Sequence, residues 1–597
     1  MTRSVLQPLL VCSLLLAMLC TSVHAAEARY RLTLADALPG GAAMVDLSNF
    51  DGKFTGGDVG IAPSDVTALL REGDKLSGKL SCTLDKQVCA FDIDASVREG
   101  AVTGTYTGTR GETKVNGAVT GVVTTAAFAP SPEHPVGYRG DGTGVFAFTN
   151  PPTKWSPGEW APGLKNVRWR VKFDSPYAWG NAQPLVVGNR DFVFSEPTIM
   201  ACLDTETGAT IWKKDMNLLW TLKGEEFTKY WAMWGEREKA ADGWRKGDAV
   251  ATARLKELDA ILIPKVKLIG DGCQQKYLKG YGFASPVSDG ARVYIKNVTG
   301  MLAAVDLDGN VQWAHDIGYN GGHSSVASLC LVDGHLIVWN AVNNSAQHTL
   351  ASYDAKTGEL SWKTEPRPAG PGAGCASPVV LRLKDVPVIL AANGDVVRAA
   401  DGKILAKEIH PQGFSTPPYH DDVVFFGVNG GNESVGAIEA VRLTLDGDKV
   451  TGTKLWSAKP QVKDGANDGS MYGAQVYYDG YLYTYLSRGQ LSAIDADTGE
   501  VKYAWHAHPG KGGEVYSNLS VAGGKVYGFD LNGRGIVVKP GPAGDVIARN
   551  DCMGGATGSP FFATNRIYLR NNFRKWMPTW IYCLEEDKPA GDGGNAK

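Results

Sequence analysis

The sequence lacks most of the features by which enzymes and membrane proteins are recognised. No CxxC or CxxCH motif occurs, so neither a zinc ribbon nor c-type haem attachment is supported. HExxH, GxSxG and phosphate-loop motifs are also absent. The formal net charge is only −3, which excludes the strongly basic surface typical of nucleic-acid binders. Beyond the amino terminus no segment has about 18 uninterrupted apolar residues, so no membrane span is expected.

The amino terminus has the pattern of a secretory signal peptide. Arg3 supplies the positive charge, residues 9–20 form a short apolar stretch, and Val23-His24-Ala25 places small residues before the expected cleavage site. We therefore expect residues 1–25 to be a signal peptide and the mature chain to begin at Ala26. The predicted location is the periplasm or the extracellular space.

Export permits disulfides, and eight cysteines remain after the signal. Cys82 and Cys89 flank a plausible turn at residues 85–87, so we predict a disulfide between them across a hairpin. The other six are scattered, and burial as small apolar side chains is the favoured interpretation.

One phrase recurs along the chain. It has the form Asp-x-x-Thr-Gly-x-x-x-Trp, with variations, at residues 202–212, 304–313, 352–362 and 493–503. With 73 glycines, 16 tryptophans and 22 tyrosines, the repeat is typical of a β-propeller. In the phrase the Asp ends a strand, Thr-Gly turns the chain, and the aromatic side chain packs between blades. The residues predicted to lock the blades in this way are Asp204, Trp212, Asp306, Trp313, Asp354, Trp362, Trp456, Asp495 and Trp169.

The spacing predicts eight blades. Candidate innermost strands begin near residues 181, 283, 323, 376, 414, 472, 516 and 558, mostly 42–52 residues apart. The last unit lacks a fourth strand, and residues 166–173, which include Trp169, have no blade of their own. We expect this strand to complete the last blade and close the ring. The fourth unit, 398–402, has no following Trp, so we expect its outer edge to pack less well.

The predicted fold is all-β: an eight-bladed propeller, a small amino-terminal β-sandwich or open barrel, and a helical insertion. Alternating apolar and polar residues indicate antiparallel strands before residue 126, with one short helix at 63–72. Helical spacing of apolar residues at 218–268 predicts a helical hairpin in a loop between blades. The expected divisions are 26–126 for the amino-terminal domain, 127–164 for a Pro/Gly-rich linker, 165–585 for the propeller, and 586–597 for a disordered tail.

These phrases resemble the pyrroloquinoline-quinone-like propeller repeat of bacterial secreted proteins. The repeat is that of quinoprotein alcohol dehydrogenases and of the propeller subunit of the outer-membrane barrel-assembly machinery, and the resemblance covers residues 165–585. A quinoprotein dehydrogenase implies adjacent cysteines and Glu, Asn and Asp side chains around calcium and the quinone. The sequence has no Cys-Cys pair, and the repeated Asp residues are strand-end residues. No cofactor is therefore predicted, and pyrroloquinoline quinone with calcium belongs only to an alternative interpretation.

The favoured function is non-catalytic binding or scaffolding in the bacterial cell envelope, by a monomeric propeller. A protein or glycan partner would bind in the axial funnel or on loops. Candidate ligand-binding residues lie at the starts of innermost strands: Trp179, Asn181, His323, Ser324, Ser415, Tyr472, Tyr516 and Asn518. Two enzyme alternatives stay open: a quinone-dependent dehydrogenase, and a polysaccharide lyase or hydrolase using residues such as His323, His410, His420, His506 and His508.

Overall fold

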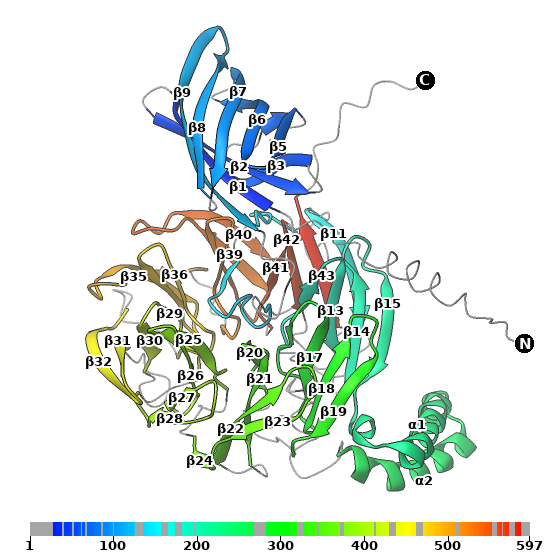
Figure 1. Cartoon of the computed structure of the whole chain (residues 1–597). Helices are drawn as coiled ribbons and strands as arrows, with labels where there is room; N and C mark the ends of the chain where they lie inside the picture. Colours follow the sequence, from blue (N-terminus) through cyan, green and yellow to red (C-terminus); the bar gives the residue numbers. More distant parts are fainter. Residues whose placement is uncertain are drawn as a thin grey trace, which may run out of the picture. The chain divides into compact units, whose positions relative to one another are not determined.

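The computed structural model divides into two compact units, Met1–Ala126 and Ala127–Lys597, which are described separately. Strands dominate both units (Figure 1). The predicted signal peptide and the predicted tail beyond residue 586 lie outside the described residues. The structure describes residues 28–38, 41–50, 53–60, 63–65, 68–84, 87–98, 101–125, 130, 135–146, 149–156, 165–173, 182–195, 198–267, 282–318, 326–342, 346–369, 375–410, 414–428, 437–460, 470–508, 514–551, 558–563, 565–571 and 579–586.

In the described part of the first unit, nine strands form one antiparallel sheet, in the order β3-β2-β1-β9-β8-β7-β6-β4, with β5 also paired to β6. Alternate side chains, among them Leu76, Leu80, Phe91 and Ile93, are buried on one face and form its core, as expected for strands with one solvent face. The strands are β1 (Ala28–Leu38), β2 (Gly41–Phe50), β3 (Lys53–Gly60), β4 (Pro63–Asp65), β5 (Leu69–Glu72), β6 (Lys75–Leu84), β7 (Gln87–Arg98), β8 (Ala101–Arg110) and β9 (Thr113–Thr125).

The helix predicted at residues 63–72 is wrong. This stretch contains the strands β4 and β5, and β5 pairs with β6 from Leu69 opposite Gly78 to Glu72 opposite Lys75. Gly73 has a φ of +58° in the turn between them, a conformation that glycine adopts without strain. The tight turn therefore favours a hairpin over the helix that the short apolar spacing indicated.

Strands β6 and β7 place Cys82 directly opposite Cys89. Directly opposite residues of antiparallel strands have Cα atoms about 4.5–5.5 Å apart, which lies within the range that a disulfide spans. The side chain of Cys82 is outside the described residues, so the disulfide stays a prediction.

We expect the Cys82–Cys89 disulfide to stabilise the first unit by about 2 kcal/mol, because the loop that it closes is short. The measurement is intact mass with and without reduction, followed by urea unfolding of the Cys82→Ser/Cys89→Ser variant monitored by circular dichroism. A Cys202→Ser variant is the control, since Cys202 is buried in the second unit. Two free thiols at Cys82 and Cys89 in the exported protein would contradict the prediction.

The described residues of the second unit form eight antiparallel four-stranded sheets, two of which gain a further short strand. Seven follow one another along the sequence, and the eighth combines β11 with β41, β42 and β43. The sheets are β12 (Leu185–Val187), β13 (Arg190–Ser195), β14 (Ile199–Asp204), β15 (Thr210–Asp215); β16 (Val287–Ser288), β17 (Arg292–Lys296), β18 (Met301–Asp306), β19 (Val311–Asp316); β20 (Cys330–Val332), β21 (His335–Ala341), β22 (Gln347–Asp354), β23 (Leu360–Lys363), β24 (Arg367–Pro368); β25 (Val379–Leu383), β26 (Val386–Leu390), β27 (Val396–Arg398), β28 (Ile404–Ala406); β29 (Tyr419–His420), β30 (Val423–Gly427), β31 (Ile438–Asp446), β32 (Lys449–Ala458); β33 (Val476–Tyr478), β34 (Tyr481–Tyr485), β35 (Gln490–Asp495), β36 (Val501–His506); β10 (Val145–Phe146), β37 (Ser520–Ala522), β38 (Lys525–Phe529), β39 (Arg534–Val538), β40 (Val546–Asp551); and β11 (Val167–Phe173), β41 (Phe561–Ala563), β42 (Arg566–Asn571), β43 (Thr579–Glu585).

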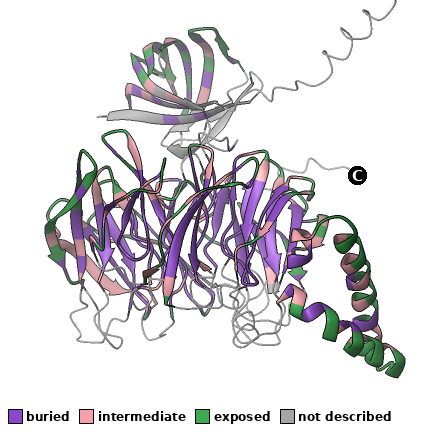
Figure 2. Cartoon of the chain, turned by 60° about the horizontal axis from the view of Figure 1, so that its bottom comes forward, coloured by how far each residue is buried: buried purple, intermediate pink, exposed green. Residues whose placement is uncertain are grey.

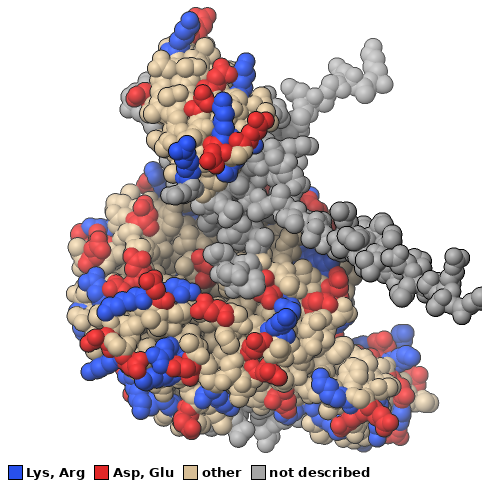
Figure 3. Space-filling view, viewed as in Figure 1, with Lys and Arg blue, Asp and Glu red and all other residues tan. Residues whose placement is uncertain are grey.

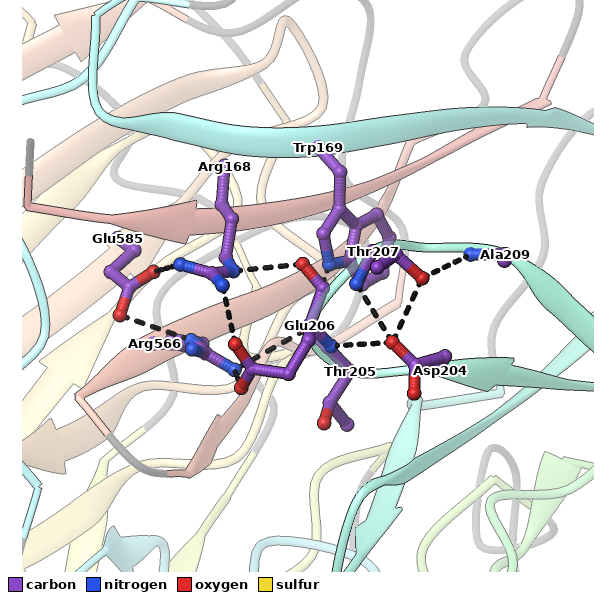
Figure 4. Close-up of polar contacts among 9 residues, drawn as sticks. All are labelled: Arg168, Trp169, Asp204, Thr205, Glu206, Thr207, Ala209, Arg566 and Glu585. Atoms are coloured by element: carbon purple, nitrogen blue, oxygen red, sulfur yellow. Dashed lines mark hydrogen bonds and ion pairs between the residues drawn. The ribbon is translucent and has the colours of Figure 1, made fainter.

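The expected pairing of residues 166–173 with the last unit is confirmed. β11 runs antiparallel to β43, with Phe173 opposite Thr579 and Arg170 opposite Tyr582. An ion-pair network joins this last sheet to the first (Figure 4): Arg168 contacts Glu206 and Glu585, and Arg566 contacts the same two carboxylates. The beginning and the end of the second unit therefore meet in one sheet.

Tryptophan side chains connect five of the described sheets to the next. The Nε1 of Trp169 donates to Thr205 O at 2.8 Å, and the Nε1 of Trp212 donates to Leu307 O at 2.9 Å. The same bond joins Trp313 to Ala355, Trp362 to Ala399, and Trp456 to Ala496. Each indole lies on the turn glycine of the neighbouring sheet, where a Cβ would come within 2.6–2.9 Å of the ring. The five glycines, Gly208, Gly309, Gly358, Gly402 and Gly499, all have positive φ.

The aspartates of the recurring phrase stabilise these turns by accepting hydrogen bonds. Oδ1 of Asp204 accepts hydrogen bonds from the backbone N–H groups of Glu206 and Thr207 and from the Thr207 hydroxyl. Asp306, Asp354 and Asp495 likewise accept from backbone N–H groups of the following turn. The hydrogen bonds from Thr207 lower the pKa of Asp204, although burial opposes the shift.

Where this tryptophan-to-backbone hydrogen bond does not occur among the described residues, other contacts join the sheets. The sheet of β25–β28 meets the next sheet through Arg398 and Lys403, which both contact Asp448. Tyr503 and Trp505 of β36 lie on Gly544 of the following sheet. Trp155 stacks on Phe529 at a centroid distance of 5.6 Å. The described strands of the second unit are mostly buried (Figure 2).

The helical elements lie between β15 and β16. They are the 3-10 helix η1 (Leu218–Thr221) and the α-helices α1 (Gly224–Arg245) and α2 (Ala249–Val266). Asp248 caps α2 by accepting from the N–H groups of Val250 and Ala251. Trp234 of α1 is buried with Leu219 and Leu258, and its Nε1 donates to Asp215 of β15. The two helices therefore pack on each other and are fastened to the first four-stranded sheet.

Candidate functional site

Residues 135–146 join four sheets that are distant in sequence. Val136 forms an antiparallel bridge with Ser288 of β16, with N–H···O distances of 3.0 and 2.8 Å. β10 pairs in parallel with β37. Arg139 donates from its backbone N–H to Gln183 Oε1 and from Nη2 to Gln475 O. All four contact points lie in or just before the first strand of a sheet, so residues 135–146 lie among these first strands. We call residues 135–146 the central segment.

The Gly-rich sequence of the central segment permits this path. Gly137 and Gly140 exchange two backbone hydrogen bonds, and Gly142 and Gly144 have φ values of +96° and +86°. A Cβ on Gly144 would lie 2.6 Å from Nη2 of Arg139. Only glycine allows both the backbone conformation and the close approach.

The expectation that 127–164 is a linker needs correction. Val136, Arg139, Phe146 and Trp155 are buried, and Phe146 contacts the rings of Phe561 and Phe562 at 5.3 and 5.1 Å. The proline and glycine content indicated an irregular backbone, but it did not reveal that apolar side chains within it fill the interior. The described part of this stretch belongs to the packing of the second unit.

A pocket lies between the central segment and four of the sheets. Its volume is about 540 Å³, open solvent included. One wall is formed by residues 135–142, and the other by residues in or next to β16, β20, β25 and β29. Among the lining residues Asp141 carries the single charged side chain. We call this cavity the central pocket.

Burial keeps Tyr419 and Cys330 of the central pocket protonated. It raises the pKa of Tyr419 to about 12 and that of the Cys330 thiol to about 12. A thiol reacts as its thiolate, so Cys330 has little nucleophilic character at neutral pH. Burial also lowers the pKa of Arg139, whose Nε and Nη1 have no hydrogen-bond partner among the described residues.

Four of the predicted ligand-binding residues, Trp179, Asn181, His323 and Ser324, lie outside the described residues. The structure brings the other four together beside the central segment. Tyr472 and Tyr516 stack with centroids 4.9 Å apart. Oδ1 of Asn518 accepts from the Tyr138 hydroxyl at 3.1 Å and from Ala474 N at 2.7 Å, and Ser415 accepts from Gln475 at 3.4 Å. None of the four lines the central pocket.

A belt of hydrogen bonds that the sequence reasoning missed also connects the sheets. In each case the backbone N–H of a residue just before one first strand donates to a side-chain oxygen just before the next. The pairs are Gln183 to Ser285, Ser328 to Ser377, Ser377 to Thr416, and Asn518 to Ser559, at 2.9–3.0 Å. The signal was available: Ser285, Ser377, Thr416 and Ser559 all precede a proline.

The candidate catalytic histidines His410 and His420 do not form a common site. His410 bonds Glu439 at 2.9 Å and His420 stacks on Tyr477, and neither lines the central pocket. Within the described ranges no group of three or more His, Cys, Asp or Glu residues could hold a metal ion. Cys202 and Cys583 are buried without a disulfide, whereas Cys330 and Cys375 are half-buried; Cys273 and Cys552 lie outside the described residues.

The central pocket does not fit a calcium-bound quinone. Calcium takes six to eight oxygen ligands, carboxylates prominent among them. The lining offers a single carboxylate, that of Asp141, and its Oδ1 already accepts from the N–H and hydroxyl of Thr143. The central segment also lies where the first strands converge. No catalytic step through such a group follows from these residues.

Comparison with known families gives a match over more than half of the chain. Residues 273–381 and 384–586 match the model of the outer membrane protein assembly factor BamB. The chain belongs to this family. The recurring phrase is therefore the PQQ-like repeat of the BamB family.

A curated BamB, from Moranella endobia (strain PCIT), is 26% identical over 273 residues. The match covers 43% of this chain and 64% of that protein, so the chain spans less than two thirds of its relative. Among solved structures, BamB from Moraxella catarrhalis has a TM-score of 0.43 at 13% identity, covering 70% of this chain and 98% of that one. Quinohemoprotein alcohol dehydrogenase from Comamonas testosteroni has a TM-score of 0.42 at 13% identity, covering 72% and 78%. At these scores neither likeness carries a conclusion about function.

Proposed function

We propose that the eight four-stranded sheets are the blades of one closed eight-bladed β-propeller. The support is that the described contacts run from each sheet to the next, and that Trp169 and Arg168 link the last sheet to the first. In this arrangement Trp169, Trp212, Trp313, Trp362 and Trp456 lock neighbouring blades. The first unit is then an amino-terminal β-domain, and η1, α1 and α2 form an insertion between two blades.

We propose further that the protein is a non-catalytic scaffold of the bacterial cell envelope. The observation that carries this proposal is the occupation of the centre by the chain's own residues 135–146, beside a pocket with one carboxylate. A centre built in this way supports assembly and recognition and offers no oxygen cage for a metal ion. Membership of the BamB family favours a protein partner over a glycan.

The proposed location rests on the amino-terminal sequence, and the proposed partner class rests on the distribution of surface charge. Residues 1–25 would be removed on export, leaving a monomer in the periplasm. None of the described helices is long and apolar enough to cross a membrane. On the face shown in Figure 3, basic and acidic side chains are interspersed, which suits a protein partner better than a nucleic acid.

Two experiments on the full chain test this function. In the first, purified protein is incubated with pyrroloquinoline quinone and calcium and assayed for dye reduction with alcohols and sugars. We expect no turnover, and quinone-dependent turnover would overturn the scaffold proposal. In the second, the tagged protein is cross-linked in the cell of origin and the cross-linked sites are mapped.

The cross-linking result expected is one envelope protein joined repeatedly to the same residues of this chain. A variant lacking residues 218–268 reports on the helical insertion, because loss of the partner would place the contact there. The matched control is Trp244→Ala, which changes one exposed residue of α1 and keeps the helices. Cross-links distributed over unrelated proteins without a common site would contradict a scaffold role.

A further inference from the structure

The central pocket is bounded by strand edges that remain unpaired among the described strands. β20, β25 and β29 each end their sheets and pair on one side only, with β21, β26 and β30 respectively. Residues in or next to all three line the pocket. An unpaired edge presents backbone N–H and C=O groups that an extended chain can pair with.

The protein already uses this mode of binding at the same centre. The central segment pairs with β16 through Val136 and Ser288, and with β37 through β10. Both contacts add an extended stretch to the free edge of a first strand. The central segment therefore shows which ligand these edges accept, and it leaves the edges of β20, β25 and β29 available among the described residues.

The walls of the pocket define the side chains that would fit. Leu331, Val379 and Val380 give one wall apolar character, and the phenols of Tyr138 and Tyr419 add hydroxyl groups. Asp141 is exposed and lines the pocket, and its Oδ1 is held by Thr143. A cation next to this carboxylate would gain a charge-assisted hydrogen bond.

We infer that the central pocket binds a short extended peptide that carries small apolar side chains and a free amino terminus or basic side chain next to Asp141. The pocket is open to solvent, so an extended peptide would place only one or two of its side chains inside it and lie along the strand edges with the rest. The inference rests on the proposed scaffold function and deepens it, because it assigns a peptide site to the centre of the unit.

The test measures fluorescence anisotropy of a carboxy-terminally labelled tetrapeptide, Val-Val-Ala-Val, titrated with the full-length protein. The free-amine peptide is expected to bind about threefold more tightly than its N-acetylated form, because only the free amine pairs with the exposed carboxylate of Asp141. In Asp141→Asn this difference should disappear, since the amide oxygen still accepts from Thr143 but carries no charge.

A second variant tests the place of binding. Val380 lines the pocket and is half-buried, so Val380→Trp is expected to fill the pocket and abolish binding of both peptides. The control is Val250→Trp on α2, where the residue is 80% exposed and binding should be unchanged. Tryptophan is well accepted in strands, and unchanged unfolding of Val380→Trp confirms that it folds.

Absence of saturable binding, equal binding of the two peptides to the unmodified protein, or unchanged binding in Val380→Trp would each overturn the inference. Failure here is distinguishable from failure of the scaffold function. If the cross-linked envelope partner persists while the tetrapeptide does not bind, the scaffold function stands and the peptide site is wrong. If quinone-dependent turnover appears, the scaffold function itself falls.

Discussion

Replacing Trp169 with alanine is expected to lower the free energy of unfolding of the second unit by about 3–5 kcal/mol, the usual cost of truncating a buried tryptophan. Only 7% of this side chain is exposed. Its Nε1 donates to Thr205 O at 2.8 Å, and its ring lies on Gly208 and beside Tyr568. The variant therefore loses a buried hydrogen bond and leaves a cavity where the first sheet meets the last.

Loss of Trp169 should affect the second unit more than loss of the corresponding tryptophans of other sheets, because of the sheet in which Trp169 lies. Trp212 and Trp313 each join two sheets built from consecutive strands, whereas Trp169 lies on β11, which forms a sheet with the carboxy-terminal strands β41, β42 and β43. Opening this contact would expose apolar side chains between two sheets, and exposed apolar surface promotes aggregation. We therefore expect Trp169→Ala to aggregate on heating at a lower temperature than Trp212→Ala.

Urea unfolding followed by tryptophan fluorescence makes the measurement. All 16 tryptophans lie between residues 155 and 580, so the signal reports on the second unit alone. Trp244→Ala in α1 is the matched control, because 55% of that side chain is exposed and such substitutions usually cost less than about 0.5 kcal/mol. A change below about 1 kcal/mol in Trp169→Ala would show that the contact between the first and last sheets does not depend on the indole.

The ion pairs at the contact between the last sheet and the first should contribute much less to the free energy of unfolding than the Trp169 side chain. Arg168 and Glu206 are both partly exposed, and exposed pairs contribute about 0–1 kcal/mol. Arg168→Ala is therefore expected to change the unfolding midpoint only slightly, and salt should reduce even this effect. Comparing Arg168→Ala with Trp169→Ala separates charge from packing at one location.

The local repeat was predictable because it depends on short-range chemistry. An Asp that accepts from the next turn, a glycine with positive φ and an aromatic residue after it lie within about ten residues in Asp204–Trp212 and Asp354–Trp362. The pairing of residues 166–173 with the last sheet was also predictable, because the last unit lacked a strand.

The centre of the second unit was not predictable in the same way. The buried Arg139 donates hydrogen bonds to Gln183 and Gln475. These partners are distant in the sequence, and no local pattern indicates them. The proline and glycine around it indicated only irregular backbone. The candidate ligand-binding residues Tyr472, Tyr516 and Asn518 were correctly placed near first strands, but the contacts that occupy them come from three different parts of the chain.

One buried acid predicts an unusual dependence of stability on pH. Asp191 of β13 is fully buried, and neither carboxylate oxygen has a hydrogen-bond partner among the described residues. Arg566 lies at the contact between the last sheet and the first, but its guanidinium pairs with Glu206 and Glu585 rather than with Asp191. Burial raises the pKa of Asp191 well above its ordinary value, because a carboxylate loses its hydration without compensation.

The direction of the effect follows from proton linkage. A carboxyl group whose pKa is raised by folding holds a proton in the folded state that it has lost in the unfolded state. The folded state is therefore favoured below the ordinary carboxyl pKa, and this advantage is lost as pH rises through the raised value. Over that window Asp191 lowers the free energy of unfolding by up to about 1.4 kcal/mol per pH unit.

Asp191→Asn removes this dependence, since the amide has nearly the same shape and does not ionise. We expect the variant to be close to wild type near pH 4 and more stable at pH 8 by roughly 3 kcal/mol, the scale of an uncompensated buried charge. Urea midpoints measured by tryptophan fluorescence from pH 4 to 8 make the comparison. Asp308→Asn is the control, because that carboxylate is largely exposed and pairs with Arg190. If Asp191→Asn tracks wild type at every pH, folding does not shift the pKa of Asp191, and this carboxyl group does not set the pH dependence of the second unit.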